Sequence, residues 1–414
     1  MAPESRRIEK MNSAKVEVLV SGFAFGGRAV GRSPDGKVCF VRGAVPGEKI
    51  LVRVTSDKKK YSEGVLEEVL EPSPLRRSAV CPNLCPGCSY SQIPYELELE
   101  WKQRQFRSFA EKAGMAKLSP DFLLDPVGSP VRTGWRNKIR LALEFASDGT
   151  VRAGYRGEDN KSLIPITDCP LAVPEIREVL RRGRWRDRLT GQEKNITFRW
   201  TRKNGVHTYT DRGKPIILTD ELTGFGDFQT GGNSFFQVNP FMSGRLAAEV
   251  MRLIQLIQPV FMVELYCGCG CFSVLAAEQL PALRSFGVEL DHGAVKNARI
   301  NAERHGVAGR AEFEAGDSAE VFRKKYSSGL PPGTLLLTDP PRTGLDSSMR
   351  DLIGRSKAQY IIYVSCSPDT LFRDLAQLEK ASYRIRKSRI LDMFPSTAHF
   401  ESITLCEHIE GEKT

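Results

Sequence analysis

Apolar and polar positions alternate in short runs over roughly the first 70 residues of the chain. The runs KVEVLV, KVCFV, EKILVRV and EGVLEEVL are separated by glycines and by a Pro46-Gly47 turn. Alternation with a period of two predicts strands, and the glycines and the proline between the runs predict tight turns. We therefore expect a small antiparallel β-barrel over residues 13–72.

Helical and extended patterns are mixed between residues 73 and 235. Residues 90–113 have the pattern of a charge-rich amphipathic helix, whereas GWRNKIRLALEF and VRAGYR favour strands. A further helix is predicted at VPEIREVLRRGRWRDRL, where arginines surround Trp185. Interleaved cations and aromatics can hold phosphate and stack on bases, but a solvated helix face has the same composition. We expect a central α+β domain over residues 73–235.

Strand and helix patterns then alternate regularly over residues 236–414. A strand at Phe261–Glu264 is followed by a turn with Gly268 and Gly270, by a helix, and by a second strand at Ser285–Glu289. This order is the opening βαβ unit of a doubly wound sheet. We therefore expect a Rossmann-like domain over residues 236–414.

Acidic residues follow successive strands of this domain. Glu289, Asp317 and Asp339 each end a strand, at the edge where open α/β sheets bind ligands. Glu289 is placed to accept hydrogen bonds from ribose hydroxyls, and Asp317 is placed to accept one from an adenine amino group. Asp339 is expected to lie beside the reacting centre. The turn has two glycines in place of a full GxGxxG, which favours S-adenosylmethionine over a dinucleotide as the ligand. The alternative to a cofactor-binding turn is a tight turn in an ordinary α/β sheet.

Charge narrows the class of partner. Lysine plus arginine number 60 against 50 for aspartate plus glutamate, which gives a formal net charge of +10. This excess favours a polyanion such as nucleic acid, because neutralised phosphates release counterions. No apolar run is long enough to cross a bilayer, and the first residues lack the apolar core of a signal peptide. We expect a cytoplasmic protein without a membrane partner, whose cysteines are ligands or nucleophiles.

Three cysteines lie close together at Cys81, Cys85 and Cys88, and Cys169 follows in ITDCP. Four thiolates in proline-kinked loops are typical of a zinc ion or an iron–sulfur cluster, the alternative being unrelated free thiols. The CxxxCxxC spacing also matches radical S-adenosylmethionine enzymes, in which three cysteines leave one iron open. Against that alternative, Cys169 offers a fourth ligand, and the βαβ unit lies about 180 residues away.

Two motifs at neighbouring strand ends indicate the reaction. The segment Asp339-Pro-Pro-Arg342 ends one strand, and Cys366 ends the next. Uracil C5 is a weak nucleophile, but a thiolate that adds to C6 creates an enolate at C5 that can attack a methyl group. A base must then remove the C5 proton, and Glu401 is the candidate, with His399 two residues away. Cytosine-5 and amino-directed methyltransferases place a cysteine or an aromatic residue in the proline segment, so both fit less well.

Together these motifs resemble the RNA uracil-5-methyltransferase family, in the subgroup that has a TRAM domain and a [4Fe–4S] cluster. The resemblance covers nearly the whole chain, and FGGRAVGR, VRGAVPGEK and EPSPLRR are similar to a TRAM domain, an RNA-binding barrel. The other matching segments are the cysteine cluster with ITDCP, FFQVNP, ELYCGCGCFS, GVE, DPPRTGLD, VSCSPDT and FPSTAHFES.

The resemblance implies a role for each matching residue. Cys366 is the nucleophile and Glu401 the base. The cluster ligands are Cys81, Cys85, Cys88 and Cys169. The contacts to S-adenosylmethionine are Gln237, Tyr266, Glu289, Asp339 and, as a weaker match, Asp317.

The implied activity is methylation of uridine C5 in RNA, for which we favour 23S ribosomal RNA over transfer RNA. The alternative from another class is a non-catalytic iron–sulfur RNA-binding factor. We expect a monomer that flips the target uridine out of the RNA, with Phe235 or Phe236 filling the gap, although a Phe–Phe pair is ordinarily part of a core.

The chain departs from the family pattern in two places. Cys81 and Cys85 are closer together than is usual, and Cys271 replaces the usual asparagine after the second glycine. With Cys267 and Cys269, Cys271 forms a CxCxC run, which we interpret as small residues in a tight turn whose thiols point in different directions.

Overall fold

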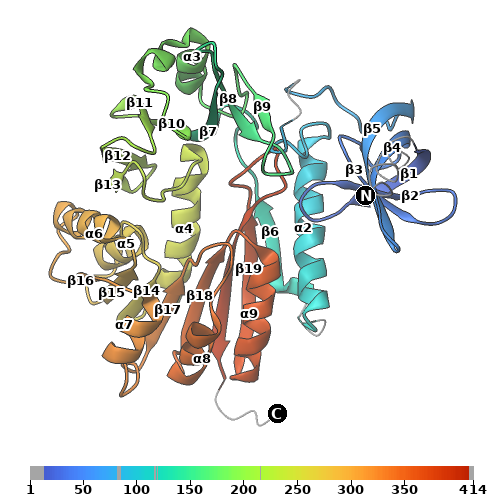
Figure 1. Ribbon diagram of the computed structural model, residues 1–414. Helices are drawn as coiled ribbons and strands as arrows, with labels where there is room; N and C mark the ends of the chain where they lie inside the picture. The colour runs from blue at the N-terminus through green and yellow to red at the C-terminus, as the bar shows by residue number, and fades with distance from the viewer. Residues whose placement is uncertain (1–13, 82–84, 116–117, 119, 215, 410–414) are drawn as a thin grey trace, which may run out of the picture. The chain divides into compact units, whose positions relative to one another are not determined.

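The structure is a computed structural model that describes residues 14–81, 85–115, 118, 120–214 and 216–409. The chain divides into two compact units (Figure 1). The barrel unit comprises the described residues of 1–105, 157–162 and 394–399. The sheet unit comprises the described residues of 106–156, 163–393 and 400–414.

Five strands close the barrel of the barrel unit in the order β1-β2-β3-β5-β4. They are β1 (Lys15–Phe23), β2 (Ala29–Arg32), β3 (Val38–Arg42), β4 (Lys49–Asp57) and β5 (Tyr61–Glu71). Alternate side chains such as Val18, Val20, Ile50 and Val52 are buried inside, which is why the sequence alternates. The predicted barrel is confirmed, with one difference: β3 and β5 pair in parallel, whereas the other pairs are antiparallel.

A buried ion pair fixes residues 394–399 against helix α2 (Tyr95–Lys112) within the barrel unit. The Nζ of Lys102 lies 2.7 Å from Oε1 of Glu98, and both side chains are fully buried. The same Oε1 accepts a hydrogen bond of 2.7 Å from the backbone N–H of Ser396. Because losing one partner would leave a buried charge, removal of either costs roughly 3–5 kcal/mol. The pair therefore holds the backbone of the segment that precedes Glu401.

An eight-stranded sheet forms the sheet unit, in the order β16-β15-β14-β17-β18-β20-β19-β6. The strands are β6 (Leu123–Val127), β14 (Phe261–Leu265), β15 (Arg284–Glu289), β16 (Ala311–Ala315), β17 (Thr334–Thr338), β18 (Tyr360–Ser365), β19 (Tyr383–Leu391) and β20 (Glu401–His408). Strands β14 to β18 are parallel, as a doubly wound fold requires. Strand β20 enters antiparallel between β18 and β19.

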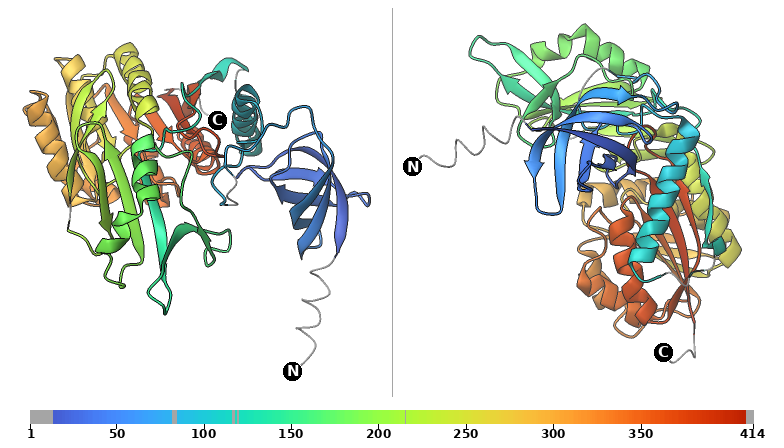
Figure 2. Two further views of the ribbon diagram at one scale, coloured as in Figure 1. Left: turned by 90° about the horizontal axis from the view of Figure 1, so that it is seen from above. Right: turned by 90° about the vertical axis from the view of Figure 1, so that its right-hand side faces the viewer.

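Helices cover both faces of this sheet. They are α4 (Pro240–Ile257), α5 (Cys271–Gln279), α6 (His292–Arg304), α7 (Ser318–Lys325), α8 (Ser347–Ser356) and α9 (Pro368–Lys380). Helices α4, α5 and α6 contact one another in series, and so do α7, α8 and α9 (Figure 2). The second half of α2 joins the core beside α9, where the rings of Phe106 and Phe372 are 4.8 Å apart. This architecture confirms the Rossmann-like prediction.

A smaller sheet with the order β11-β10-β7-β8-β9 also belongs to the sheet unit. Its strands are β7 (Lys138–Phe145), β8 (Val151–Arg156), β9 (Leu163–Pro165), β10 (Asn195–Thr201) and β11 (Gly205–Thr210), and β12 (Ile217–Leu222) and β13 (Gly226–Gly231) form a separate hairpin. Strand β6 precedes β7 in the sequence and follows the short helix η1 (Pro120–Phe122), but it pairs with β19 of the larger sheet. The division at residues 72/73 and 235/236 stays a prediction about folding domains.

The arginine-rich segment is two helices and not one. Helix α3 (Pro174–Arg182) ends at Gly183, whose φ of 72° is left-handed, and the short helix η2 (Arg184–Arg188) follows. Trp185 is buried against Phe198, with ring centroids 5.5 Å apart, so its ring packs in the core. Among the helices of the described ranges, every one is too short or too polar to span a membrane.

Candidate active site

The turn after β14 is built around the carboxylate of Glu289. One oxygen of Glu289 accepts a hydrogen bond of 3.1 Å from the N–H of Gly268, and the other accepts one of 2.9 Å from Asp291. Tyr266 enters the turn with a left-handed φ of 62°. A Cβ added to Gly268 would meet nothing within 4 Å, so the space above this glycine is open to a ligand. At Gly270 a Cβ would clash with Phe313, so this glycine is required for packing.

A second carboxyl group, which the sequence analysis missed, lies beneath the same turn. Glu264 is 1% exposed, and its Oε2 accepts a hydrogen bond of 2.8 Å from the N–H of Ser273 as well as one from the Ser273 hydroxyl. Burial raises the pKa of Glu264 to about 8, and the negative charges of Asp339 and Glu289 add to the rise. An acidic residue at the end of an apolar strand, directly before a glycine turn, was the signal in the sequence.

The CxCxC run corrects one expectation. The Sγ atoms of Cys269 and Cys271 lie 3.6 Å apart, so two of the three thiols face each other. Helix α6 also fixes the backbone of this turn, because the Asn301 amide donates a hydrogen bond of 3.0 Å to the carbonyl of Cys269. Burial raises the pKa values of Cys267 and Cys271 well above the usual range for a thiol, so both are neutral.

The register of the sheet brings Cys366 and Glu401 together. Strands β18 and β20 are antiparallel and pair Ser365 with Ser402, whose hydroxyl donates a hydrogen bond of 3.1 Å to the Ser365 carbonyl. Cys366 directly follows Ser365 and Glu401 directly precedes Ser402, and the charge of Glu401 acts on the Cys366 thiol, although 34 residues separate them in the sequence. Asp339 directly follows the neighbouring strand β17 at the same edge.

Electrostatics couple these three side chains. The pKa of Cys366 is raised to about 12, mainly by burial and also by the charges of Glu401 and Asp339, while Arg342 partly offsets the rise. Burial also raises the pKa values of Glu401 and Asp339, and repulsion by Asp339 adds to the shift of Glu401. Two carboxyls close together in a site shielded from water favour sharing one proton, because their like charges repel each other. The site therefore holds a neutral thiol beside carboxyls that bind protons more strongly than usual.

One carboxyl oxygen of Glu401 is buried and accepts no hydrogen bond from the described residues. The side chain is 4% exposed, and its Oε2 has no hydrogen-bond partner among the described residues. Leaving a buried acceptor unpaired costs roughly 1–3 kcal/mol, so such atoms in native proteins often mark functional sites. His399 precedes β20 outside any strand and belongs to the barrel unit, where its ring lies edge-on to Phe394.

Arg342 is the second side chain of the site that the list of expected residues missed. It is exposed, and its position after the two prolines of the DPPR motif was the available signal. The loop that presents it is fixed by the buried carboxylate of Asp374, which accepts hydrogen bonds of 2.8 Å from the N–H of Leu345 and from the hydroxyl of Tyr363. Thr370 adds a hydrogen bond of 3.1 Å to the carbonyl of Arg342.

The FFQVNP segment is held at both ends. Lys138 donates hydrogen bonds of 3.0 Å and 3.3 Å to the carbonyls of Gly232 and Ser234, and burial lowers the pKa of Lys138 to about 8. Asn239 caps α4 by accepting from the N–H of Phe241 at 3.1 Å, and its amide donates to the carbonyl of Met393 at 3.0 Å.

The two phenylalanines between these anchors differ sharply in exposure. Phe235 is 68% exposed, whereas Phe236 is 8% exposed and belongs to the core. Of the two, Phe235 therefore has the ring that is exposed on the surface to a large partner. Gln237 follows, with a buried Oε1 that has no hydrogen-bond partner among the described residues.

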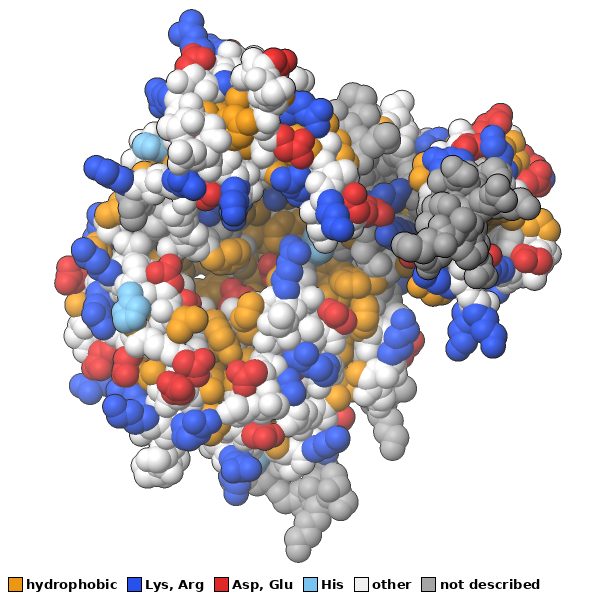
Figure 3. Space-filling model, in the orientation of Figure 1, with side chains coloured by type: hydrophobic (Ala, Val, Ile, Leu, Met, Phe, Trp, Pro, Cys, Tyr) orange, Lys and Arg blue, Asp and Glu red, His pale blue; other side chains and the backbone are white. Residues whose placement is uncertain are grey.

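Asp317 already has a structural role. Its Oδ1 accepts hydrogen bonds of 3.0 Å from the N–H groups of Ala319 and Glu320, so it caps the N-terminus of α7. The side chain remains exposed beside the carboxyl end of β16. Figure 3 shows a hollow in the sheet unit over this edge of the sheet, with hydrophobic side chains in its depth.

The four cysteines expected to hold a cluster fall in different units. Cys81, Cys85 and Cys88 belong to the barrel unit, Cys169 belongs to the sheet unit, and residues 82–84 lie outside the described residues. Within the described ranges, no three or more histidine, cysteine or acidic side chains come together as a metal site. Cys169 is buried, and the hydroxyl of Tyr155 lies 3.6 Å from its Sγ.

Comparison with known proteins agrees with this geometry. Residues 330–409 match the family described as tRNA (uracil-5-)-methyltransferase, and residues 9–66 match the TRAM domain. A solved structure of Pyrococcus abyssi tRNA (uracil-54, C5)-methyltransferase in complex with S-adenosyl-L-homocysteine is similar with a TM-score of 0.72. At 24% identity, covering 94% of this chain and 100% of that one, the likeness shows a shared fold.

Two curated relatives match over almost their full length. An uncharacterized RNA methyltransferase of Halalkalibacterium halodurans is 27% identical, covering 95% of this chain and 96% of its own. The 23S rRNA (uracil(1939)-C(5))-methyltransferase RlmD of Halomonas elongata is 28% identical, covering 96% of this chain and 90% of its own. The matched family model and the curated relatives indicate an S-adenosylmethionine-dependent methyltransferase. Within that class, the chain is similar to RNA uracil-5-methyltransferases over almost its full length.

Proposed function

We propose that this protein methylates C5 of a uridine in RNA, with S-adenosylmethionine as the methyl donor. The observation that supports this most directly is the register of β18 and β20, which pairs Ser365 with Ser402 and brings the charge of Glu401 to act on Cys366. One carboxyl oxygen of Glu401 also has no hydrogen-bond partner among the described residues. A thiol and a proton acceptor close together at a ligand-binding edge suit an addition followed by an elimination.

Cys366 first loses its proton to solvent water, and the thiolate adds to C6 of the uracil, which places negative charge on C5 and O4. Because the pKa of the half-buried thiol is about 12, its deprotonation requires a positive charge nearby, and Arg342 is the cation that acts on it. S-adenosylmethionine, when bound, supplies the methyl group that C5 takes up. Glu401 then removes the C5 proton, and the electron pair of that bond expels the Cys366 thiolate from C6. The raised pKa of Glu401 makes it a stronger base for this step.

Residues around the glycine turn fit S-adenosylmethionine. The open space above Gly268 lets a ligand approach the backbone, and Glu289 lies at the end of β15, where ribose hydroxyls bind in such folds. We propose that the contacts are Gln237, Tyr266, Glu289, Asp317 and Asp339.

We also propose that Cys81, Cys85, Cys88 and Cys169 hold a [4Fe–4S] cluster. The chemistry of the donor set supports this, because four cysteines without disulfides are the usual ligands of such a cluster. Addition and elimination at uracil transfer no electron, so the cluster would serve the structure or RNA binding.

The proposed substrate is 23S ribosomal RNA. The Halomonas elongata relative is named for a 23S uridine, whereas the Pyrococcus abyssi structure is named for a transfer RNA uridine, so transfer RNA is the second candidate. The TRAM barrel and the net charge of +10 support RNA as the partner in either case. We place the protein in the cytoplasm as a monomer.

A target base inside folded RNA must leave its stack before Cys366 can reach C6. We propose that Phe235 occupies the space which the flipped uridine leaves. Its ring is large and exposed, on a segment that Lys138 and Asn239 anchor. Phe236 cannot take this role, since it is part of the core.

The decisive experiment uses RNA that contains 5-fluorouridine. Fluorine at C5 cannot leave as a proton, so the adduct with Cys366 should persist on a denaturing gel when S-adenosylmethionine is present. Sequencing of the attached RNA would identify the substrate, and Cys366→Ala should abolish the band. If no ribosomal or transfer RNA forms an adduct with the folded wild-type protein, the proposed function is wrong.

A further inference from the structure

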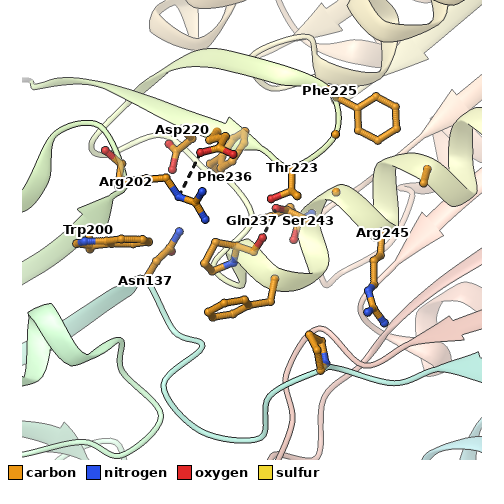
Figure 4. A pocket seen from close by; sticks show the side chains of 18 residues that line it. Asn137, Trp200, Arg202, Asp220, Thr223, Phe225, Phe236, Gln237, Ser243 and Arg245 are labelled. Atoms are coloured by element: carbon orange, nitrogen blue, oxygen red, sulfur yellow. Dashed lines mark hydrogen bonds and ion pairs between the residues drawn. The ribbon is translucent and has the colours of Figure 1, made fainter.

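A second cavity lies in the sheet unit, between strands β10 and β12 and the first turns of α4 (Figure 4). Its volume is about 630 Å³, which is large enough for a whole nucleotide. None of Cys366, Glu401 and Asp339 is among the described residues that line it. The cavity is therefore separate from the position of the target uridine in the proposed reaction.

Aromatic rings form much of the wall of this cavity. Trp200 of β10 is half-buried, and Figure 4 shows its ring along one side of the cavity. Phe236 lies deeper and is buried, and Phe241 at the start of α4 is 43% exposed. Rings of this kind give a planar ligand flat surfaces on which to stack.

A buried amide adds a hydrogen-bonding group to the wall with Trp200. Asn137 is 3% exposed, and its Oδ1 accepts a hydrogen bond from Arg199, which in turn pairs with Asp220 at 2.6 Å. Because its oxygen is bound to Arg199, the amide nitrogen is directed the other way, and Figure 4 shows it turned into the cavity. Gln237 also lines the cavity, and its buried Oε1 has no partner among the described residues.

The charges of the cavity favour a neutral base whose two neighbouring phosphate groups are negatively charged. Asp220 is neutralised by Arg199, so the floor neither attracts a free cation nor repels a base. Arg202 and Arg245 stand on opposite sides of the cavity (Figure 4). The Arg202 side chain is 68% exposed and is paired only with the half-exposed carboxylate of Glu221 among the described residues, so it is available to a phosphate.

We propose that this cavity binds a second, unstacked nucleobase of the RNA substrate, from a nucleotide other than the target uridine. Trp200 stacks on the base, Asn137 donates to an acceptor on its edge, and Arg202 and Arg245 contact the flanking phosphates. Single-stranded RNA is recognised in this manner, by aromatic stacking and by hydrogen bonds to base edges. The inference rests on the proposed function, since it takes RNA as the substrate.

The test measures binding and position separately. Ribosomal RNA transcribed with 5-fluorouridine and sparse 4-thiouridine is trapped on the protein with S-adenosylmethionine, and near-ultraviolet light then crosslinks the thiolated bases. We expect crosslinks to the peptide that contains Trp200 from bases other than the one bonded to Cys366. In equilibrium binding of the same RNA, Trp200→Ala should weaken affinity roughly tenfold and Trp200→Phe should restore most of it, because stacking needs an aromatic ring.

Two controls keep the result interpretable. Arg202→Ala leaves the wall of the cavity intact, so it should lower affinity and its salt dependence even if Trp200→Ala fails to fold. Leu256→Ala, at an exposed residue near the end of α4, should change neither.

Each other outcome overturns the inference. An adduct at Cys366 with no crosslink near Trp200 and with unchanged affinity in both variants refutes this cavity but not the proposed function. Competition by the free mononucleotides AMP, CMP, GMP or UMP as strong as that by RNA would assign the cavity to a small molecule. Absence of any Cys366 adduct refutes the proposed function and removes the basis for this site.

Discussion

Replacement of the buried Glu264 by glutamine should remove a large part of the pH dependence of folding. Glu264 lies beneath the glycine turn, where glutamine can keep the same shape and still accept the hydrogen bonds from Ser273 through its carbonyl oxygen. The variant therefore mimics the protonated carboxyl and cannot ionise. Its effect on stability depends on the charge that the wild-type residue acquires as the pH rises.

The magnitude follows from the shift in pKa. The carboxyl of Glu264 titrates near 4.5 in the unfolded chain and near 8 in the folded protein. Between these values the folded state binds one more proton, so stability is fully present below pH 4.5 and falls as the pH rises through 8. At about 1.4 kcal/mol per pH unit, the wild type should lose about 4 kcal/mol relative to Glu264→Gln between pH 5 and pH 8.

Urea unfolding of both proteins at pH 5, 6, 7 and 8 without cofactor measures this difference. Titration of Asp339 and Glu401 occurs in both proteins and largely cancels. Glu303→Gln, at an exposed position of α6, controls for the loss of one carboxylate and should follow the wild type. A difference between wild type and Glu264→Gln that changes by less than about 1 kcal/mol over this range would refute the assignment of a raised pKa to Glu264.

Three further predictions concern the reaction and the cluster. Glu401→Gln should slow release of methylated RNA roughly 10²–10⁴-fold, so that a covalent complex with unmodified RNA accumulates on denaturing gels; rapid turnover would exclude Glu401 as the base. Phe235→Ala should lower kcat/KM about tenfold on folded RNA and leave an unstructured oligonucleotide unaffected; equal losses on both would exclude a role in flipping. Cys169→Ser should lower the iron and sulfide content of the purified protein, whereas the control Cys271→Ser should leave both unchanged. An unchanged iron content in Cys169→Ser would exclude Cys169 as a cluster ligand.

Local patterns in the sequence determined most of the secondary structure and the position of the glycine turn. The strand ending before Tyr266, the helix after Gly270 and the strand ending at Glu289 are where the apolar periodicity and the glycines predict them. The barrel strands are equally clear, because one face of each is buried and the other is not. These features depend on residues that are neighbours in the chain, so the sequence alone is sufficient.

The same holds for the chemical type of the site. Cys366 and Asp339 end strands that are consecutive in the sequence, and parallel strands of a doubly wound sheet end at one edge. The sequence shows Glu264 only as the last residue of a predicted strand, and its burial in the structure reveals that it supports the turn from below.

The tertiary structure alone decided which distant residues meet. Cys366 and Glu401 come together because β20 enters the sheet antiparallel between β18 and β19, and a shift of one residue in that register would turn Glu401 to the other face. Strand β6 completes the sheet from a segment far upstream, and Phe235 and Phe236 divide into an exposed and a buried ring. The sequence fixes local periodicity, whereas register and burial depend on packing between segments far apart in the chain.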